Sequence, residues 1–81
     1  MQKDIERLIY DNRKLIYSMI HYFTNYPDKD DLFQIGVVGL IKAYQNYNKD
    51  IGTKFTTYAY PYIFGEMKKY VREDKGIKSR Q

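Results

Sequence analysis

The sequence contains no cysteine, so neither a disulfide framework nor thiolate chemistry is available to the protein. It also lacks a long hydrophobic segment, because its longest run without a polar residue, 35–41, is far short of a membrane span. The N-terminal residues alternate between charged and apolar types and lack the apolar stretch of a signal peptide. These absences predict a cytoplasmic protein without a membrane segment.

Residues that usually carry catalysis or bind metals are scarce. His21 is the only histidine and has no partner at ligand spacing. Asp28, Asp30 and Asp31 lie close together, but the glycine and the distal glutamate of a calcium-binding loop are missing. The glycine-containing segment 35–39 lies inside a helical pattern and lacks the Lys-Ser/Thr of a phosphate loop. We therefore expect no metal, no cofactor and no catalytic residues, and hence no enzyme.

The charge of the chain is unevenly distributed. The 81 residues suffice for one small domain, 1–81, and their net charge is +4. Residues 1–50 contain seven cations and seven anions, whereas residues 51–81 contain seven cations and three anions. The whole positive excess therefore lies in the C-terminal third, a distribution that is typical of nucleic-acid-binding surfaces.

Hydrophobic periodicity predicts a compact all-α domain of three helices and no strand. The first helix, 1–26, is amphipathic, with a break near Asp11 and Asn12. Its apolar side is formed by Ile5, Leu8, Ile9, Leu15, Ile16, Met19, Ile20 and Phe23. Turn and breaker residues follow, so this helix ends before Pro27.

The second helix is predicted over 28–47. The acidic residues that begin with Asp28 favour a helix N-terminus, through capping and through the helix dipole. Gly36 and Gly39 lie in the helix interior, where each is about 1 kcal/mol less favourable than alanine. They indicate that another backbone comes close, and we attribute this to helix packing within the domain.

The third helix is predicted over 53–74. It should begin close to Thr57, because Pro61 is tolerated only in a first turn. Gly52, in the preceding loop, is expected to have a positive φ. The segment 75–81 lacks periodicity and is predicted to be a tail. Four aromatic residues are expected to close one end of the core: Tyr44, Tyr47, Phe55 and Phe64.

Two faces are expected along the third helix. The apolar face, which should point into the core, carries Ala59, Ile63, Met67 and Tyr70. The other face changes from rings to cations and carries Tyr58, Pro61, Tyr62, Gly65, Lys69 and Arg72. Rings can stack on unpaired bases, at roughly 1–3 kcal/mol per base, and the cations can bind phosphates. The alternative is an ordinary tyrosine-rich helix whose cations complement its dipole.

The segment 31–74, DLFQIGVVGLIKAYQNYNKDIGTKFTTYAYPYIFGEMKKYVRED, resembles region 2 of the bacterial sigma-70 family, in the sporulation, flagellar and stress branch. The pattern D-L-x-Q-x-G-x-x-G-L-x-K-A, followed by G-x-K-F-[ST]-T-Y-A, is too long to arise by chance. NRKLIYSMIHYF, residues 12–23, resembles the preceding part of the same domain. The resemblance implies a transcription-initiation module that binds core RNA polymerase and recognises and melts the promoter −10 element.

The resemblance assigns polymerase binding to the second predicted helix. In the family this helix docks on the clamp-helix coiled coil of the β′ subunit of RNA polymerase. The matching positions here are Asp31, Gln34, Ile35, Val37 and Ile41. Ile35 stands where housekeeping members usually have an acid, so an apolar contact is expected to replace a charged one.

The resemblance assigns DNA binding to the third predicted helix. Its KFTTYA segment matches the part of the family that melts the −10 element and captures an unpaired base of the non-template strand. The implied DNA-binding residues are Lys54, Phe55, Thr57, Tyr58, Pro61, Tyr62, Lys68, Lys69 and Arg72. Pro61 and Tyr62 replace paired tryptophans that act as a wedge, which predicts a stronger dependence on promoter sequence. Gly65 occupies a −10-contacting position but has no side chain to read a base.

The chain stops at Gln81, whereas longer sigma factors continue into a domain that reads the −35 element. It is either an excised region or a stand-alone subunit, like the region-2-like partner of split sigma factors, and the compact fit favours the second. The expected partners are core RNA polymerase, promoter DNA and a second sigma subunit that reads the −35 element. A rival interpretation is a regulatory adaptor that binds polymerase or an anti-sigma factor without opening DNA. A third is a basic helical domain that binds nucleic acid by charge alone.

Overall fold

The computed structural model describes residues 2–23 and 26–80. Helices are the only regular structure in these two ranges, which confirms the all-α prediction. They are, in chain order, α1 (Gln2–Asp11), α2 (Arg13–Ile20), α3 (Lys29–Asn46) and α4 (Phe55–Arg80), with short 3-10 helices at His21–Phe23 and Lys49–Ile51.

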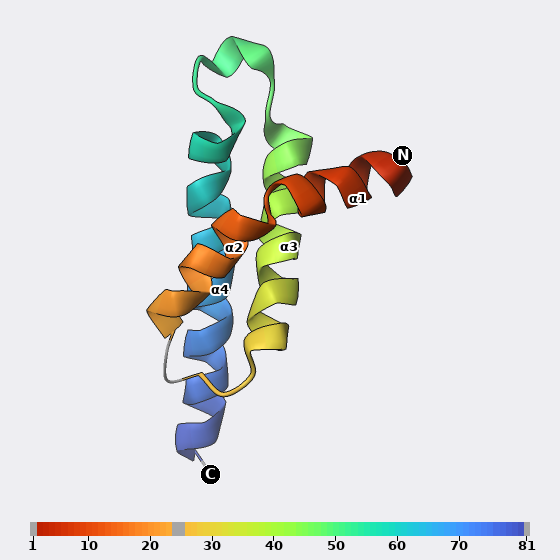
Figure 1. The fold of residues 1–81 in the computed structure, drawn as a ribbon. Coiled ribbons are helices and arrows are strands. Elements are labelled where there is room, and N and C mark those ends of the chain that lie inside the picture. The colour runs from red at the N-terminus through yellow and green to blue at the C-terminus, as the bar shows by residue number, and fades with distance from the viewer. Residues whose placement is uncertain (1, 24–25, 81) are drawn as a thin grey trace.

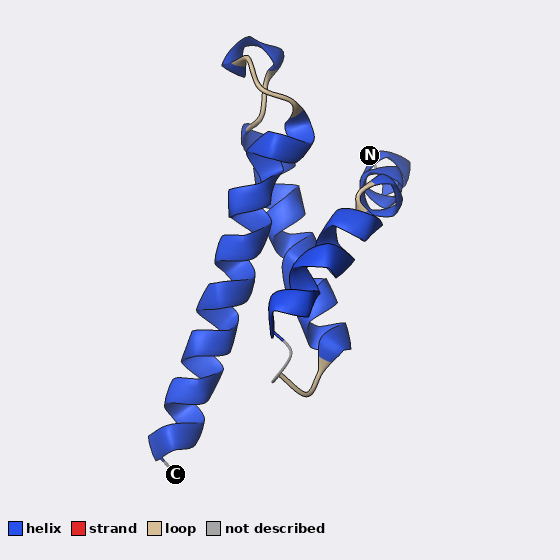
Figure 2. Ribbon diagram, turned by 60° about the vertical axis from the view of Figure 1, so that its left-hand side comes forward, coloured by secondary structure: helices blue, strands red, loops and turns tan. Residues whose placement is uncertain are grey.

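Helices α3 and α4 form an antiparallel pair, and α2 lies across it (Figure 1). Helix α1 extends away from these three helices, with the N-terminus at its far end, as both ribbon views show (Figures 1 and 2). The molecule is accordingly elongated, with dimensions of 46 × 23 × 21 Å. The C-terminal part of α4 and the loop that joins α3 to α4 lie at opposite ends of the long axis (Figure 1).

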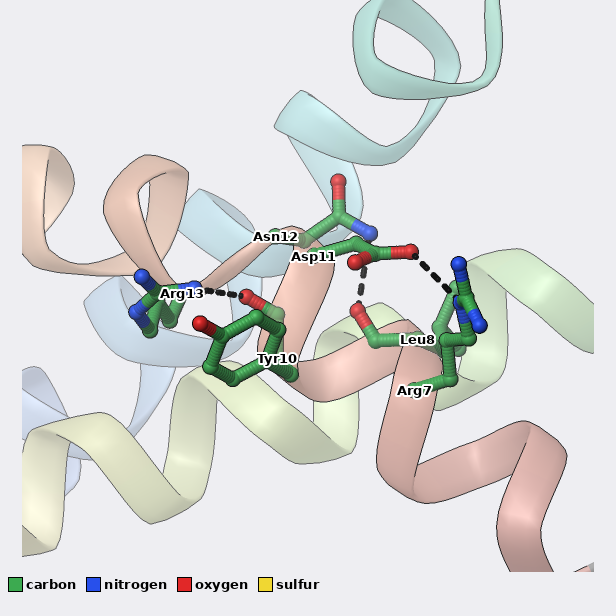
Figure 3. Close-up of polar contacts among 6 residues, drawn as sticks. All are labelled: Arg7, Leu8, Tyr10, Asp11, Asn12 and Arg13. Carbon is green, nitrogen blue, oxygen red and sulfur yellow. Dashed lines mark hydrogen bonds and ion pairs between the residues drawn. The ribbon is translucent and has the colours of Figure 1, made fainter.

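The prediction of a single first helix over 1–26 is wrong in extent, although its predicted break is confirmed. Asn12 separates α1 from α2, and α2 ends at Ile20, where a 3-10 turn follows. The backbone of Asn12 leaves the helical region at φ −111° and ψ 12°. Its side-chain Nδ2 donates a hydrogen bond to the carbonyl oxygen of Leu8 at 2.9 Å (Figure 3). The backbone N–H of Asn12 donates to the same carbonyl at 3.2 Å, so the side chain adds a second hydrogen bond at the end of α1 and holds Asn12 at the break.

A second side chain supports the break between α1 and α2. Arg13 donates from Nη1 to the carbonyl oxygen of Tyr10 at 2.7 Å, and its guanidinium lies 3.8 Å from the centroid of the Tyr10 ring (Figure 3). The nearby ion pair of Arg7 with Asp11 is longer, at 3.7 Å, and both of its side chains are exposed. Exposed pairs of this kind contribute little to stability.

We predict that Asn12→Ala lowers the free energy of unfolding by about 1 kcal/mol, because Asn12 is buried and its hydrogen bond is lost. Asp11→Ala is the matched control, since it removes only the exposed ion pair, and should change the free energy by less than about 0.5 kcal/mol. Urea denaturation followed by circular dichroism measures both values. Equal values for the two variants would show that Asn12 does not fix the break.

The core lies where α2, α3 and α4 meet. Its fully buried large side chains are Ile16, Met19, Leu32, Leu40, Ile63 and Met67. A Cβ atom on Gly36 would lie 2.7 Å from side-chain atoms of Ile16 and Met67. One on Gly39 would lie 2.6 Å from the backbone oxygen of Tyr62. The two glycines therefore let α3 and α4 approach closely, which confirms that they serve packing within the domain.

The predicted boundaries of α3 agree with the structure to within its capping residues. Asp28 adopts an extended conformation, and its carboxylate accepts a hydrogen bond from the backbone N–H of Asp31 at 3.1 Å. This is the N-cap that the acidic cluster predicted. After α3, Gly52 ends the 3-10 turn with a φ of +88°, so the predicted positive φ is confirmed.

The start of α4 corrects the sequence prediction. The helix begins at Phe55, not at Thr57, and Lys54 contributes the first accepting carbonyl, to the N–H of Tyr58 at 3.0 Å. Phe55 packs against two aromatic rings at the end of α3, which starts the helix early. Pro61 consequently lies inside the helix and cannot donate to the carbonyl of Thr57. Both residues are exposed, so water can satisfy that carbonyl.

The prediction that a tail follows the third helix from residue 75 is also wrong, because α4 continues to Arg80. Backbone hydrogen bonds extend a helix without any apolar periodicity. The segment contains no proline to interrupt them, and its lysine and arginine residues are good helix formers. The third predicted helix, 53–74, is therefore extended in the structure by about two turns.

Candidate functional surfaces

The outward face of α4 carries most of the predicted DNA-binding residues. Six of them are exposed: Lys54, Thr57, Pro61, Lys68, Lys69 and Arg72. Among the described side chains of α4, 55–72, the only acid is Glu66. Its carboxylate binds Lys42 of α3 at 2.9 Å and so is already neutralised by a cation. The exposed face is therefore positively charged along its described length.

The other three predicted DNA-binding residues, Phe55, Tyr58 and Tyr62, are half-buried in a cluster of rings. We call it the Tyr58 cluster, and it comprises Tyr44, Tyr47, Phe55, Tyr58 and Tyr62. Tyr58 lies between its neighbours, with ring centroids 5.2 Å from Tyr47 and 5.3 Å from Tyr62. A base that stacks on Tyr58 must therefore compete with rings of the protein itself.

Hydrogen bonds hold Tyr58 in its cluster. Its hydroxyl lies 3.1 Å from the hydroxyl of Tyr62 and donates to the carbonyl oxygen of Asn46 at 3.3 Å. The bond with Tyr62, followed by burial, raises the pKa of Tyr58 above its ordinary value. Sequence reasoning missed this arrangement, because Tyr47 and Asn46 lie at the end of α3, outside the helix that carries Tyr58.

A second group of rings lies on the other side of α4, against α2 and its following 3-10 turn. Phe64 is 5.5 Å from Tyr22, 5.6 Å from Phe23 and 6.1 Å from Tyr60, between ring centroids. The prediction that Phe64 joins Tyr44, Tyr47 and Phe55 is therefore wrong. Its position on α4 turns it towards α2, while Tyr58 and Tyr62 face the end of α3. Only the four-residue spacing of Tyr60 and Phe64 hinted at this group.

The predicted polymerase-binding residues lie along α3 but differ in exposure. Gln34 is exposed, and Ile35, Val37 and Ile41 are half-buried. The sequence prediction missed Val38, which is 42% exposed. With Gln34, Ile41 and Gln45 it has the spacing of one helical face, opposite the glycines that pack on α4. The outer face of α3 therefore presents an apolar strip bordered by glutamines.

Asp31, the first predicted polymerase contact, is bonded within the protein. Its Oδ2 accepts a hydrogen bond from the hydroxyl of Tyr70 on α4 at 3.0 Å. Hydrogen bonding with Tyr26 and with Asp31 raises the pKa of Tyr70 well above its ordinary value, so Tyr70 stays a donor. A partner that binds Asp31 must share this carboxylate with α4.

The described residues form a small all-α domain, with a cationic, aromatic face on α4 and an apolar, glutamine-bordered face on its antiparallel neighbour α3. Within residues 2–23 and 26–80, no helix combines the length and the apolarity that crossing a membrane requires. Among the residues whose side chains the structure describes, 3–23, 26–48 and 50–72, there is no cluster of potential metal ligands.

Comparison with known proteins gives the particular family. A family model described as Sigma-70 region 2 matches residues 8–76. The chain is 42% identical to the RNA polymerase sigma-G factor of Clostridium acetobutylicum over 74 residues, which cover 90% of this chain and 29% of that protein. It is 37% identical to the RNA polymerase sigma-F factor of Bacillus subtilis over 78 residues, which cover 95% of this chain and 31% of that protein.

The chain belongs to the sigma-70 region 2 family, as the motifs of its sequence indicated. Its similarity to sigma-G and sigma-F factors agrees with the sporulation-type branch that the resemblance named. The RNA polymerase sigma-B factor of Bacillus anthracis is also similar, at 39% identity over 84% of this chain and 27% of that protein. The chain thus spans less than a third of the length of these three relatives.

Proposed function

We propose that this chain is a transcription-initiation module that binds core RNA polymerase through α3 and the promoter −10 element through α4. The observation that carries the proposal is the separation of the two predicted sets of residues onto different faces of one packed helix pair. Because the faces differ in chemistry, each fits one partner: apolar with a polar border on α3, cationic with aromatic rings on α4. Both partners can bind at once.

The polymerase-binding face is proposed to centre on Val38 and Ile41, with Gln34 at its border. Residues at the centre of an interface, shielded from water by those around them, usually carry most of the binding energy. The clamp-helix coiled coil of β′ is the proposed partner segment. Asp31 would contact polymerase while its carboxylate still accepts the hydrogen bond from Tyr70. A polymerase contact at Asp31 would therefore be connected to the position of α4.

The DNA-binding face is proposed to bind the non-template strand of the −10 element and to melt the promoter. Lys54, Lys69 and Arg72 would neutralise phosphates, and Tyr58 would receive an unpaired base. The base has to displace Tyr62 or Tyr47 from contact with Tyr58. Capture therefore requires a strand that is already unpaired and held in place. No catalytic step is part of this function, and it is carried out in the cytoplasm with the polymerase.

A fluorescent single-stranded −10 oligonucleotide, titrated with the chain in the presence of core RNA polymerase, tests both faces. Val38→Asp should weaken assembly with polymerase by about 30-fold or more in affinity, because it places a charge in the centre of an apolar contact. Tyr58→Ala should leave assembly intact and weaken oligonucleotide binding by about fivefold or more.

Tyr10→Asp is the matched control for Val38→Asp. Tyr10 is 62% exposed on α1, outside both proposed faces, and also changes to an acid. It should assemble like the unchanged chain. Equal polymerase binding by the Val38→Asp and Tyr10→Asp variants would remove α3 from the proposal, and unchanged oligonucleotide binding by the Tyr58→Ala variant would remove base capture.

One observation favours a second function, that of a regulatory adaptor which binds polymerase or an anti-sigma factor without opening DNA. The hydroxyl and the ring of Tyr58 are both engaged by the protein's own residues. Run-off transcription separates the two functions. If the chain opens no promoter with core polymerase, either alone or with a second sigma subunit that reads the −35 element, the adaptor function is favoured.

A further inference from the structure

A tyrosine of α4 forms a side-chain hydrogen bond with the start of α3. The hydroxyl of Tyr70 donates to Oδ2 of Asp31 at 3.0 Å, although the two residues are 39 positions apart in the sequence. Asp31 lies in the first turn of α3 and precedes Gln34 and Val38 by three and seven residues, so these side chains share one helical face. The bond therefore joins α4 to the N-terminal end of the proposed polymerase-binding face.

The ring of Tyr70 is held in place by its own contacts. It is half-buried and packs against the core, where it meets the ring of Tyr26 at a centroid distance of 5.9 Å and an angle of 61°. Tyr26 is itself buried, and its backbone N–H donates to the carbonyl oxygen of Phe23 at 3.0 Å. Hydrogen bonding with Tyr26 and with Asp31 raises the pKa of Tyr70, so its hydroxyl stays protonated at neutral pH. Tyr70 is therefore a fixed hydrogen-bond donor.

Asp31 is held both at its backbone and at its side chain. Its backbone N–H donates to the capping carboxylate of Asp28 at 3.1 Å, and its own carboxylate accepts from Tyr70. An ionised carboxylate has about four acceptor positions, of which the hydroxyl of Tyr70 fills one. The side chain is half-buried, so part of it still reaches the surface. Asp31 therefore presents a carboxylate of fixed orientation that can accept further hydrogen bonds from a partner.

A carboxylate of fixed orientation binds a cation more tightly than a mobile one. Without the bond, the side chain of Asp31 would rotate among staggered conformers. A partner would then have to immobilise it, which weakens association by roughly two- to tenfold. The partner group that fits is a lysine or arginine side chain, whose N–H groups donate to a carboxylate. The buried core and the ion pair of Lys42 with Glu66 already join α3 to α4, so the distinctive effect of the bond is the orientation of Asp31.

We propose that Tyr70 is a positioning residue of the polymerase-binding face. Its hydroxyl holds the carboxylate of Asp31 in the orientation that a cationic side chain of core RNA polymerase binds. The proposal rests on the proposed function, because it requires that Asp31 contacts polymerase. It adds a residue that lies outside α3 and outside the residues that match the polymerase-binding motif, so that α4 contributes to polymerase binding as well as to DNA binding.

The affinity of the full chain for core RNA polymerase tests the proposal, in a double-mutant cycle of Tyr70→Phe with Asp31→Ala. Tyr70→Phe keeps the ring and its contact with Tyr26 but removes the hydroxyl. It should weaken binding by about fivefold at about 0.15 M salt. In the Asp31→Ala background the same substitution should change the affinity by less than about twofold. Tyr10→Phe removes an exposed hydroxyl on α1, and this matched control should bind like the unchanged chain.

Salt dependence separates positioning from a general loss of structure. Salt screens a contact between charges, so the fivefold effect of Tyr70→Phe should shrink to less than about twofold at about 0.5 M salt. A structural defect would weaken binding by the same factor at both salt concentrations. Asp31→Asn keeps an acceptor for the hydroxyl of Tyr70 but removes the charge. In that second background, too, Tyr70→Phe should change the affinity by less than about twofold.

Equal weakening by Tyr70→Phe with and without the carboxylate of Asp31 would overturn the proposal, because the effect would then come from packing. An unchanged affinity of the Tyr70→Phe variant would overturn it as well. If Asp31→Ala binds polymerase like the unchanged chain while Val38→Asp binds more weakly, Asp31 is not a polymerase contact, so the proposal fails and the proposed function stands. If none of these substitutions changes polymerase binding, Val38→Asp included, the proposed function fails together with the proposal.

Discussion

Gly39→Ala is expected to lower the free energy of unfolding by about 2 kcal/mol, although alanine is intrinsically the better helix former. The added Cβ would lie 2.6 Å from the backbone oxygen of Tyr62 and 2.7 Å from the Cα of Ile63. Backbone atoms inside a helix cannot rotate away, so α3 and α4 must move apart along their main contact. In a domain of 81 residues the stability margin is thin, and a loss of this size unfolds a measurable fraction.

Two other glycines provide matched controls for the same substitution. Gly36→Ala meets the side-chain ends of Ile16 and Met67 at 2.7 Å, and the flexible end of Met67 can shift, so a smaller loss is expected. Gly65 has no atom within 4 Å of an added Cβ, and Gly65→Ala should raise the free energy of unfolding by about 0.8 kcal/mol. Urea denaturation of the three variants gives the order of their free energies of unfolding. If Gly39→Ala is as stable as Gly65→Ala, the close approach of α3 to α4 is refuted.

The parts of the fold that follow from local chemistry could be predicted from the sequence. Asp28 caps α3, Gly52 takes a positive φ, and Asn12 breaks the first helix, each for a reason that involves only neighbouring residues. The start of α4 could not be predicted in this way. The contacts of Phe55 with Tyr44 and Tyr47 were predicted and are confirmed, but the sequence did not show that Phe55 already lies inside the helix when it makes them.

The same distinction, between local pattern and contacts with other helices, applies to the candidate surfaces. Periodicity identified which residues of α4 face the core, and Ala59, Ile63 and Met67 are indeed fully buried. It could not show that rings of the outward set are covered by the end of α3, because a helical pattern does not specify which neighbour lies beside it. The bond of Asp31 to Tyr70 and the contacts of Phe64 with Tyr22 and Tyr60 were missed for the same reason.

The free chain is expected to bind a closed promoter duplex only weakly and to acquire promoter recognition in an assembly with polymerase. The exposed cations of the proposed DNA-binding face, Lys54, Lys68, Lys69 and Arg72, can neutralise only a few phosphates. At physiological salt this electrostatic attraction leaves the affinity in the non-specific range, with a Kd of about 10⁻⁴–10⁻⁶ M. Lys42 adds nothing to it, because its ammonium group binds Glu66.

Base capture cannot compensate for this weakness in the free chain. Flipping a base out of a closed duplex costs a few kcal/mol. The captured base must also displace rings packed at 5.2 and 5.3 Å from Tyr58, together with the hydrogen bonds of its hydroxyl. Polymerase bound at Val38 and Ile41 would hold α4 against DNA that is already fixed elsewhere, and so would make the same contacts effectively intramolecular.

A band-shift titration on a closed promoter duplex, at about 0.15 M salt, compares the affinity of the free chain with that of its assembly with polymerase. The assembly with core polymerase, together with a −35-reading subunit where one is required, should bind with a Kd of about 10⁻⁸ M or tighter, at least about 100-fold better than the free chain. Val38→Asp should abolish this gain and leave the weak binding of the free chain unchanged, because Val38 lies on α3, away from the DNA-binding face. Tight, sequence-specific binding by the free chain would contradict the prediction, since α4 would then recognise a closed promoter without the polymerase contacts of α3.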